Sequence, residues 1–386
     1  MITELSIKNY KSILDDTIQL SNVNVLIGEN GSGKTNFLEA VAMLSAAKSN
    51  RLDISGLSDR GVRVTKPNLT VSSFLGKKQK KEIEIEVLIK TKSDKNPSKM
   101  NCKLSSTKED DIYAQWVDKS ILELPPRSDK EIKMLEELAE RYESQLKLLQ
   151  ESMMPYISEK LAFFSKYAIY NLDTQALRGI NTQSKVMPLG ILGEGLDVLL
   201  NDFSKEEWAE LMEYNHLISW LDDIVIDASD KLKFDGHKLG RSNSILYFRD
   251  KYMSKRNNVF AAENSNEGVL HILFYLALFI SKKTPTFFAI DNIETALNPK
   301  LCRILMKEIA ALAIKHNKQV LITTHNPAIL DGLNLHDDKQ RLFVIKRTDE
   351  GYSKSERIKL KPESDEKLKL SEMWMRGYLG GLPTNF

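Results

Sequence analysis

Residues 23–36 read VNVLIGENGSGKTN, and this stretch decides the fold. The apolar run Val23, Val25, Leu26 and Ile27 is typical of a strand that delivers the chain into a glycine-rich loop. After the loop, apolar residues recur at helical spacing as far as Lys48. The sequence therefore predicts a strand, a glycine loop and a helix in direct succession.

The loop itself matches G-x-x-x-x-G-K-[ST] at every fixed position from Gly28 to Thr35. Its glycines let the backbone wrap around a polyphosphate, and the following helix presents its positive end to the same anion. Lys34 is expected to reach the β and γ phosphates, and the Thr35 hydroxyl to ligate Mg²⁺. We therefore predict that ATP and Mg²⁺ bind at Gly28, Glu29, Asn30, Gly31, Ser32, Gly33, Lys34, Thr35 and Asn36.

A second strand-and-helix region begins after Pro285. The apolar run that ends at Ile290 predicts a buried strand, residues 299–316 a helix, and residues 320–322 a further strand ending in Thr323-Thr324-His325. Such strands alternating with helices imply a parallel or mixed sheet covered on both faces. Asp291 directly follows a strand and fits the carboxylate that a P-loop needs on its Mg²⁺ side, although such an acid can also be a helix cap.

The composition is that of a globular protein rather than a disordered or fibrous one. The 386 residues contain 55 Lys+Arg and 53 Asp+Glu, a formal charge of +2 that dictates no partner. Cys102 and Cys302 are the only cysteines, which favours a reducing compartment. The start at Met1 lacks a signal-peptide pattern, and the near-apolar run 269–280 is too short to cross a bilayer. We expect a cytoplasmic protein without a membrane partner.

Two segments in the first half of the chain leave alternatives open. A lysine-rich stretch, 76–103, surrounds an alternating strand from Ile83 to Ile89, and predicts either a solvated hairpin face or an edge that meets nucleic acid. Apolar residues from Ile132 to Met153 recur at spacings of three and four, the heptad pattern of paired helices. This helix could pack as a hairpin inside the protein or form a seam between two chains.

The order of several motifs resembles the ABC-type ATPases of the SMC/RecF/OLD group. The motifs are Ile7-Lys8-Asn9-Tyr10-Lys11-Ser12, the P-loop GENGSGKTN, residues 264–268, IDNIETALNP from Ile290 to Pro299, and LITTHNPAIL from Leu321 to Leu330. The resemblance covers about residues 1–48 and 259–347. It implies an α/β fold, a P-loop ABC-type ATPase head with a mixed or parallel sheet flanked by helices, plus a helical insertion with a short heptad helix.

The resemblance also implies roles for individual residues. Asn9, Tyr10 and Lys11 would lie near the nucleotide base or phosphates, and His325 would be the switch histidine at the γ-phosphate. Ser265, Asn266, Glu267 and Gly268 look like a degenerate signature motif that reaches the γ-phosphate bound by a second subunit. Judged from the residues alone, that segment is equally a helix cap, and a histidine at a strand end is often structural.

One departure from the group concerns catalysis. In ABC transporters the Walker B aspartate, which corresponds to Asp291 here, is followed directly by an acid that polarises the attacking water. In this chain that next position is Asn292, whose amide cannot accept a proton. Glu294 matches the second acid of a DExE-like run and is the best available base, so we expect slow hydrolysis with Glu294, Asn292 and His325 as the catalytic set. Arg178 could contact a phosphate or the dimer partner, but a surface salt bridge is the preferred interpretation.

The organisation expected from these motifs has three parts. Residues 1–110 would form the N-terminal part of the head, 111–200 the helical insertion with its return linker, and 201–386 the C-terminal part of the head. OLD-family proteins carry a Toprim nuclease domain after the ATPase. Its pattern, a Glu followed by a strand that ends in Asp-x-Asp, does not appear after His325.

The chain is therefore similar to stand-alone ATPase subunits of two-gene phage-defence systems such as Septu and PARIS. That resemblance implies a homodimer or higher even oligomer formed through ATP, which acts as a nucleotide switch for a separate nuclease or toxin effector. The alternatives are a RecF-like DNA-repair ATPase, which would bind DNA, and a non-hydrolysing nucleotide-gated scaffold.

Overall fold

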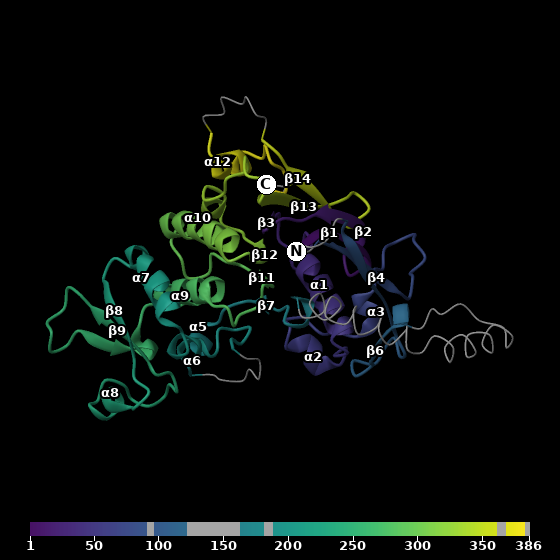
Figure 1. The fold of residues 1–386 in the computed structure, drawn as a ribbon. Coiled ribbons are helices and arrows are strands. Elements are labelled where there is room, and N and C mark those ends of the chain that lie inside the picture. The colour runs from purple at the N-terminus through teal and green to yellow at the C-terminus, as the bar shows by residue number, and fades with distance from the viewer. Residues whose placement is uncertain (91–95, 122–162, 181–187, 361–367, 383–386) are drawn as a thin grey trace, which may run out of the picture.

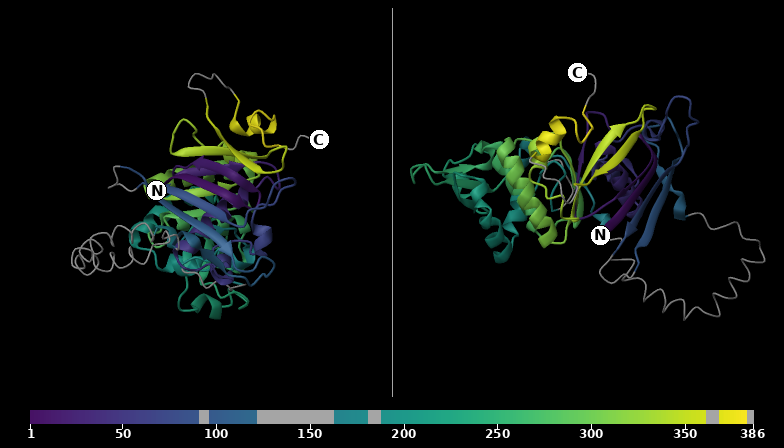
Figure 2. Two further views of the ribbon diagram at one scale, coloured as in Figure 1. Left: turned by 90° about the vertical axis from the view of Figure 1, so that its right-hand side faces the viewer. Right: turned by 90° about the horizontal axis from the view of Figure 1, so that it is seen from above.

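The computed structural model describes residues 1–90, 96–121, 163–180, 188–360 and 368–382 (Figure 1). These residues form three sheets. The central sheet is mainly parallel, a second sheet that contains the N-terminal strands is antiparallel, and a third, small antiparallel sheet lies at the opposite end of the molecule from the second. The right-hand view in Figure 2 shows the small sheet and the five-stranded sheet at opposite ends of the molecule.

The central sheet carries the loops predicted to bind nucleotide. Its strand order is β14 (Ser353–Ile358), β13 (Gln340–Arg347), β3 (Val23–Ile27), β12 (Gln319–Thr323), β11 (Phe287–Ile290) and β7 (Ile169–Tyr170). All neighbours are parallel except β13 and β14. Because β12 lies between β3 and β11, the loops that follow these three strands meet at one edge of the sheet.

Both faces of the central sheet are covered, as the apolar strands predict. Successive strand residues point to opposite faces, so Val25 joins a core with α9 (Glu267–Ile280) and α10 (Pro299–Lys315). Leu26 joins a second core with α1 (Lys34–Lys48) and the antiparallel sheet. This two-sided burial explains why the strands are apolar without alternation.

The five-stranded sheet is wholly antiparallel. Its order is β2 (Ile13–Gln19), β1 (Ile2–Tyr10), β4 (Ile83–Ile89), β5 (Ser98–Ser106) and β6 (Trp116–Asp118). Lysines of the lysine-rich stretch meet carboxylates there: Lys99 lies 2.6 Å from Glu86 and Lys81 2.6 Å from Glu109. The described part of that stretch therefore includes a hairpin with exposed ion pairs, and the nucleic-acid alternative stays a prediction.

The third sheet has the order β10 (Val259–Ala261), β9 (Leu246–Asp250) and β8 (Leu221–Ile226). Short helices connect the sheets. They are α2 (Ile54–Ser58), α3 (Pro67–Thr70), α5 (Thr174–Leu177), α6 (Leu196–Asn201), α7 (Lys205–Glu213), α8 (Lys231–Phe234), α11 (Pro327–Leu330) and α12 (Leu370–Met375). Within the described ranges, no helix combines the length and apolarity needed to cross a bilayer.

The strands and helices predicted around the P-loop, Asp291 and His325 are confirmed. The heptad segment from Ile132 to Met153 lies outside the described residues, and so does Phe386. Strands β6 and β7 fall within the range 111–200 but pair with β5 and β11 of the two head sheets. The boundaries 1–110, 111–200 and 201–386 remain a prediction.

Candidate nucleotide-binding site

The P-loop is shaped by glycines that cannot carry a side chain. Gly28 has φ +150° and Gly33 has φ +105°. A Cβ at Gly28 would lie 2.3 Å from the carbonyl oxygen of Ile345, and one at Gly33 would lie 2.3 Å from Ser353 Oγ. Both the backbone conformation and the surrounding atoms therefore require glycine at these positions.

Lys34 lies folded into this loop. It is 6% exposed, and its Nζ donates to the carbonyl oxygens of Gly28 at 2.9 Å and Glu29 at 3.0 Å. Burial lowers the pKa of Lys34 to about 8, against the opposing charges of Asp291, Glu294 and Glu29. Ser32 Oγ is also buried here, without a partner among the described residues. A desolvated cation and an unpaired hydroxyl within one glycine loop fit a polyphosphate.

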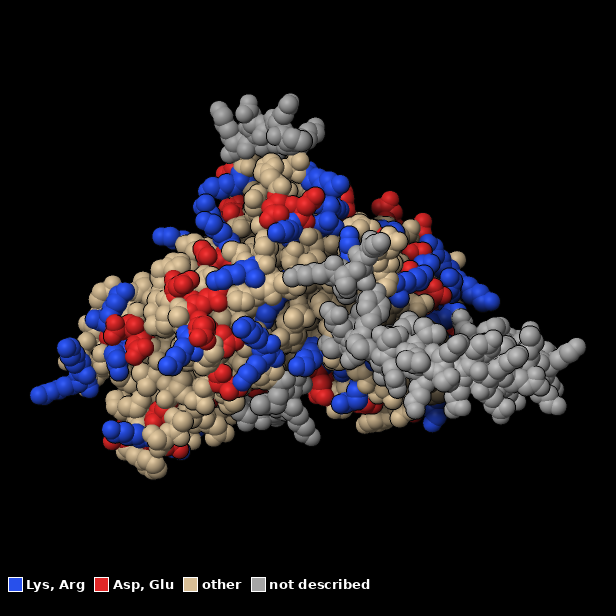
Figure 3. All heavy atoms as spheres, viewed as in Figure 1, with Lys and Arg blue, Asp and Glu red and all other residues tan. Residues whose placement is uncertain are grey.

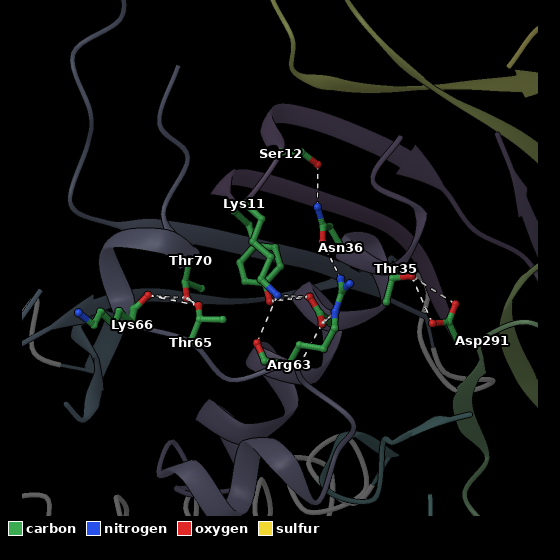
Figure 4. Close-up of polar contacts among 11 residues, drawn as sticks. Lys11, Ser12, Thr35, Asn36, Arg63, Thr65, Lys66, Thr70 and Asp291 are labelled. Atoms are coloured by element: carbon green, nitrogen blue, oxygen red, sulfur yellow. Dashed lines mark hydrogen bonds and ion pairs between the residues drawn. The ribbon is translucent and has the colours of Figure 1, made fainter. Parts of the chain in front are cut away.

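The residues predicted to hold Mg²⁺ are brought together from distant parts of the chain. Thr35 Oγ1 lies 3.3 Å and 3.2 Å from the two carboxylate oxygens of Asp291, and Thr323 also donates to that carboxylate. Figure 4 shows Thr35 and Asp291 pointing toward each other. Two oxygens about 3 Å apart suit adjacent positions around Mg²⁺, whose ligands stand about 2.0–2.1 Å from the ion. The donor set therefore fits this metal.

Glu294 connects the Asp291 loop with the histidine loop. Its Oε1 accepts the His325 N–H at 2.8 Å, while its Oε2 is buried without a partner among the described residues. Burial and the charge of Lys34 lower the pKa of His325, although Glu294 and Asp291 oppose the shift. A free carboxylate oxygen close to Lys34 and His325 is suitably placed to hold a water molecule.

Asn292 differs from Glu294 in its backbone. It has φ +55°, and its N–H donates to Thr323 Oγ1 at 3.0 Å. Asn tolerates this left-handed conformation better than most residues do. The position that holds the acid in ABC transporters is thus occupied by a residue suited to a tight turn.

The signature-like segment begins α9, but only part of it is exposed. Asn266 caps the helix by accepting the Gly268 N–H at 2.8 Å, and Glu267 lies beside it on the surface. Ser265 is only 2% exposed and donates to the Ala262 carbonyl at 2.8 Å. The structure thus brings Asn266 and Glu267 to the surface and turns the Ser265 hydroxyl inward.

Arg178 lies against this segment. Its guanidinium donates to the Ser265 carbonyl at 3.0 Å, and its own carbonyl accepts from Ser242 at 2.5 Å. No carboxylate of the described residues forms an ion pair with it, and the expected surface salt bridge stays a prediction. Arg178 instead ties the loop after α5 to the start of α9.

The turn between β1 and β2 packs against β4 and α1. Asn9 is 5% exposed and its amide donates to the Glu82 carbonyl at 3.2 Å. Tyr10 is fully buried, with its hydroxyl 3.3 Å from Glu39, and Lys11 Nζ lies 2.5 Å from the same carboxylate. The side chains of Asn9 and Tyr10 are therefore buried, and the place of Asn9, Tyr10 and Lys11 near the nucleotide stays a prediction.

The buried carboxylate of Glu39 is the centre of an ion cluster that the sequence did not predict. Arg63 donates to it from Nε at 2.7 Å and from its backbone N–H at 3.1 Å, opposite Lys11 (Figure 4). Burial alone would raise the pKa of Glu39, but its bonds to Arg63 and Lys11 outweigh burial and lower it. The one feature of the sequence that could have indicated this residue is its position as an acid among the apolar residues of α1.

Arg63 links this ion cluster to the P-loop through short polar contacts. Its guanidinium donates to Asn36 Oδ1 at 3.2 Å, and the Asn36 amide donates to Ser12 Oγ at 2.7 Å. Ser12 Oγ lies 2.6 Å from Ser353 Oγ, which donates to the Ser32 carbonyl at 2.5 Å. Nothing in the local sequence marked Arg63 or Ser353, since both act only through tertiary contacts.

Comparison with known protein families gives two matches on this chain. The family described as "AAA ATPase domain" matches residues 1–186, and the family described as "AAA domain, putative AbiEii toxin, Type IV TA system" matches residues 213–331. The first match contains the P-loop, and the second contains Asp291 and His325. Together they cover the elements that form the site.

Similarity to curated proteins is local. The chain is 49% identical to the DNA replication and repair protein RecF of Geobacillus sp. (strain WCH70) over 51 residues, 13% of this chain and 14% of that protein. It is 35% identical to RecF of Halothermothrix orenii over 94 residues, 24% of each protein. The chain thus matches about a quarter or less of the length of these relatives.

Similarity to solved structures extends over nearly the whole fold. The SMC head domain from Thermotoga maritima aligns with a TM-score of 0.52 and 12% identity, covering 93% of this chain and 99% of that one. An SMC head bound to the C-winged helix domain of ScpA aligns with a TM-score of 0.55 and 15% identity, covering 93% and 98%. At this identity the likeness concerns the fold.

The fold and the meeting of P-loop, Asp291 and His325 at one sheet edge define a P-loop ATPase head of the ABC type. The two AAA family matches include the P-loop, Asp291 and His325, and the identity with RecF is local.

Proposed function

We propose that this chain is an ATP-binding and slowly hydrolysing dimeric ATPase that acts as a nucleotide switch for a separate effector, a nuclease or a toxin, in antiphage defence. One observation carries the enzymatic part of the proposal. Lys34, the pair Thr35–Asp291 and the pair Glu294–His325 come from three loops and converge at the same edge of the central sheet.

Each of these residues has a distinct task in the proposal. Lys34 leaves the carbonyls of Gly28 and Glu29 and neutralises charge on the terminal phosphates. Thr35 and Asp291 would hold Mg²⁺, which when bound neutralises charge on the β and γ phosphates. Glu294 orients a water molecule through its free Oε2 and accepts the proton that the water loses.

Slow turnover follows from the same geometry. Asn292 cannot accept a proton, so the base is Glu294, two residues further along the loop. Glu294 also holds the His325 N–H, and the two loops must move together for its carboxylate to approach the nucleotide. A switch needs a long-lived ATP state, and a slow base supplies it.

The dimer and the effector rest on resemblance. Asn266 and Glu267 at the exposed start of α9 would complete the γ-phosphate site of a second chain. The family matched by residues 213–331 carries the words toxin and Type IV TA system in its description, which supports an ATPase working with a toxin-like effector. The similarity to stand-alone defence ATPases supports the antiphage setting.

Phage plating on a host that expresses the chain with its neighbouring gene tests the proposal. Lys34→Ala should abolish both protection and ATP turnover of the purified protein, because the lysine stabilises the transferred phosphoryl group. Lys300→Ala, an exposed lysine on α10, is the matched control and should retain both. Unchanged turnover in Lys34→Ala would overturn the P-loop assignment, and protection without the neighbouring gene would overturn the separate effector.

A RecF-like DNA-repair ATPase is the second candidate, favoured by the local identity with RecF. On the face shown in Figure 3, basic and acidic side chains are interspersed and no basic stripe stands out. DNA-stimulated turnover in the same ATPase assay would favour this candidate over the switch. A non-hydrolysing scaffold is favoured by Asn292 and would reveal itself by tight ATP binding without turnover.

A further inference from the structure

Residues 370–382 lie outside all three sheets, and one end of this segment is fastened beside the histidine loop. The Ser371 N–H and Oγ bond the two carboxylate oxygens of Asp331 at 2.9 Å and 2.8 Å. Asp331 is the C-cap of α11, and the N-cap of this helix is Asn326, the residue after His325. The start of α12 is therefore tied to the helix that follows the switch histidine.

The other end of the segment lies on the P-loop. A Cβ at Gly381 would stand 3.3 Å from Gly28 Cα and 2.6 Å from Val344 Cγ1. Gly28 has no space for a side chain either, because its own Cβ position lies 2.3 Å from the Ile345 carbonyl oxygen. Three backbone stretches, from β13, the P-loop and the C-terminal segment, thus meet without room for a methyl group.

Apolar side chains hold the segment in this position. Leu370, Trp374 and Leu379 are 9%, 3% and 6% exposed and join the core that contains Val344. Figure 1 shows α12 beside α10 and the β13–β14 hairpin. The segment pairs with no strand of the described sheets, so it can leave this surface without breaking a β-ladder.

We propose that residues 370–382 form a positioning element that holds Gly28 and α11 in the arrangement that binds ATP. The proposal rests on the ATP-binding function argued above. Because the segment contacts both nucleotide loops, ATP binding and docking of the segment stabilise each other, and the effect is equal in the two directions. Gly381 acts through Gly28 rather than on the nucleotide itself.

Two glycines of the segment provide a matched pair of variants. Gly381 and Gly377 have nearly the same backbone conformation, with φ +74° and +78°, but a Cβ at Gly377 would meet nothing within 4 Å. Both alanine variants carry the same backbone strain, and only Gly381→Ala crowds Val344 and Gly28. Calorimetry with Mg²⁺ and a non-hydrolysable ATP analogue should show affinity about tenfold or more weaker in Gly381→Ala than in Gly377→Ala, as overpacking at a close contact predicts.

Hydrogen exchange on the wild-type protein gives a second measurement that needs no variant. The analogue should slow amide exchange in residues 377–382 as well as in the P-loop, and Gly381→Ala should lose the slowing at 377–382. Equal affinities of the two alanine variants, or an exchange rate at 377–382 that the analogue leaves unchanged, would overturn the positioning role.

Failure of this inference can be told apart from failure of the proposed function. If wild type binds the analogue and Lys34→Ala does not, ATP binding stands and only the role of the segment is in question. If Gly381→Ala does not fold, the wild-type exchange measurement decides. If wild type binds no analogue at all, the proposed function fails and this inference fails with it.

Discussion

Glu294 and Asn292 illustrate how single residues set the chemistry of this site. Glu294 keeps one carboxylate oxygen bonded to the His325 N–H, while the other has no partner among the described residues, so one side chain joins two loops and could also hold a water. Asn292 lies in a left-handed turn at φ +55°, where a glutamate would be strained. In the proposed mechanism the base is therefore displaced by two residues from its place in ABC transporters.

Glu294→Gln should lower ATP turnover by about 10²–10⁴-fold while leaving ATP affinity unchanged, because the amide keeps the bond to His325 but takes no proton. Single-turnover and binding measurements on the purified protein separate the two effects. Glu213→Gln, at the exposed end of α7, removes a charge outside the nucleotide loops and serves as the control. A silent Glu294→Gln variant would exclude this residue as the base.

Lys34 predicts a pH dependence of ATP binding. Its pKa is about 8 in the free protein, and bound phosphate favours the charged form, so binding takes up a proton above that pH. Affinity should therefore fall as pH rises above 8, by up to about tenfold per pH unit. Calorimetry from pH 7 to 9.5 measures this slope. Lys34→Arg stays charged throughout this range and should lose the slope, whatever its absolute affinity.

Helix α9 begins at the signature-like segment, and its burial holds that segment in place. Thirteen of its fourteen residues are buried, and Lys318 caps its last turn by donating to the Leu278 and Ser281 carbonyls at 2.5 Å and 2.8 Å. His271 lies in its centre, fully buried, with neither ring nitrogen bonded to a described residue. The helix thus carries an ionisable group inside an apolar core.

His271 makes this element sensitive to acid. Burial lowers its pKa from 6.5 to about 4, so between these values the unfolded chain binds more protons, and stability falls as pH falls. In His271→Leu this loss is absent. Between pH 8 and pH 5, the free energy of unfolding of the variant should improve relative to wild type by about 2 kcal/mol. Urea denaturation at both values measures the difference, and an equal pH response in the two proteins would contradict it.

At the scale of the whole molecule, the exposed residues Asn266 and Glu267 begin α9, an element separate from the P-loop. If those residues complete the site of a second chain, nucleotide and association are linked. Gly268 is unsuitable for testing this, because a Cβ there would already lie 3.2 Å from the Ala296 carbonyl oxygen of the same chain.

Glu267→Arg provides the sharper test of ATP-dependent dimerisation. Sedimentation with Mg²⁺ and a non-hydrolysable analogue should show a dimer for wild type and a monomer for the variant, because the reversed charge faces the partner. Glu213→Arg, an exposed position at the end of α7, makes the same charge change and should dimerise normally. A dimer that forms without nucleotide and tolerates Glu267→Arg would show that the segment is an ordinary helix start.

The sequence alone determined the edge of the central sheet where the predicted nucleotide loops meet. Three local patterns mark this edge: the glycines around Lys34, the acid after one apolar strand and the histidine after another. The local structure of each depends on residues that are neighbours in the sequence. Apolar strands without alternation also determined that both faces of the sheet are covered. For these features, spacing along the chain is sufficient information.

Only the tertiary structure decided which side chains face the nucleotide loops. Tyr10 and Ser265 are predicted site residues, yet their side chains are buried by neighbouring elements. Glu39 with Arg63, and Gly28 with Gly381, meet although they lie far apart in the chain. Such contacts depend on how sheets and helices pack across long separations, and local hydrophobic spacing carries no record of that packing.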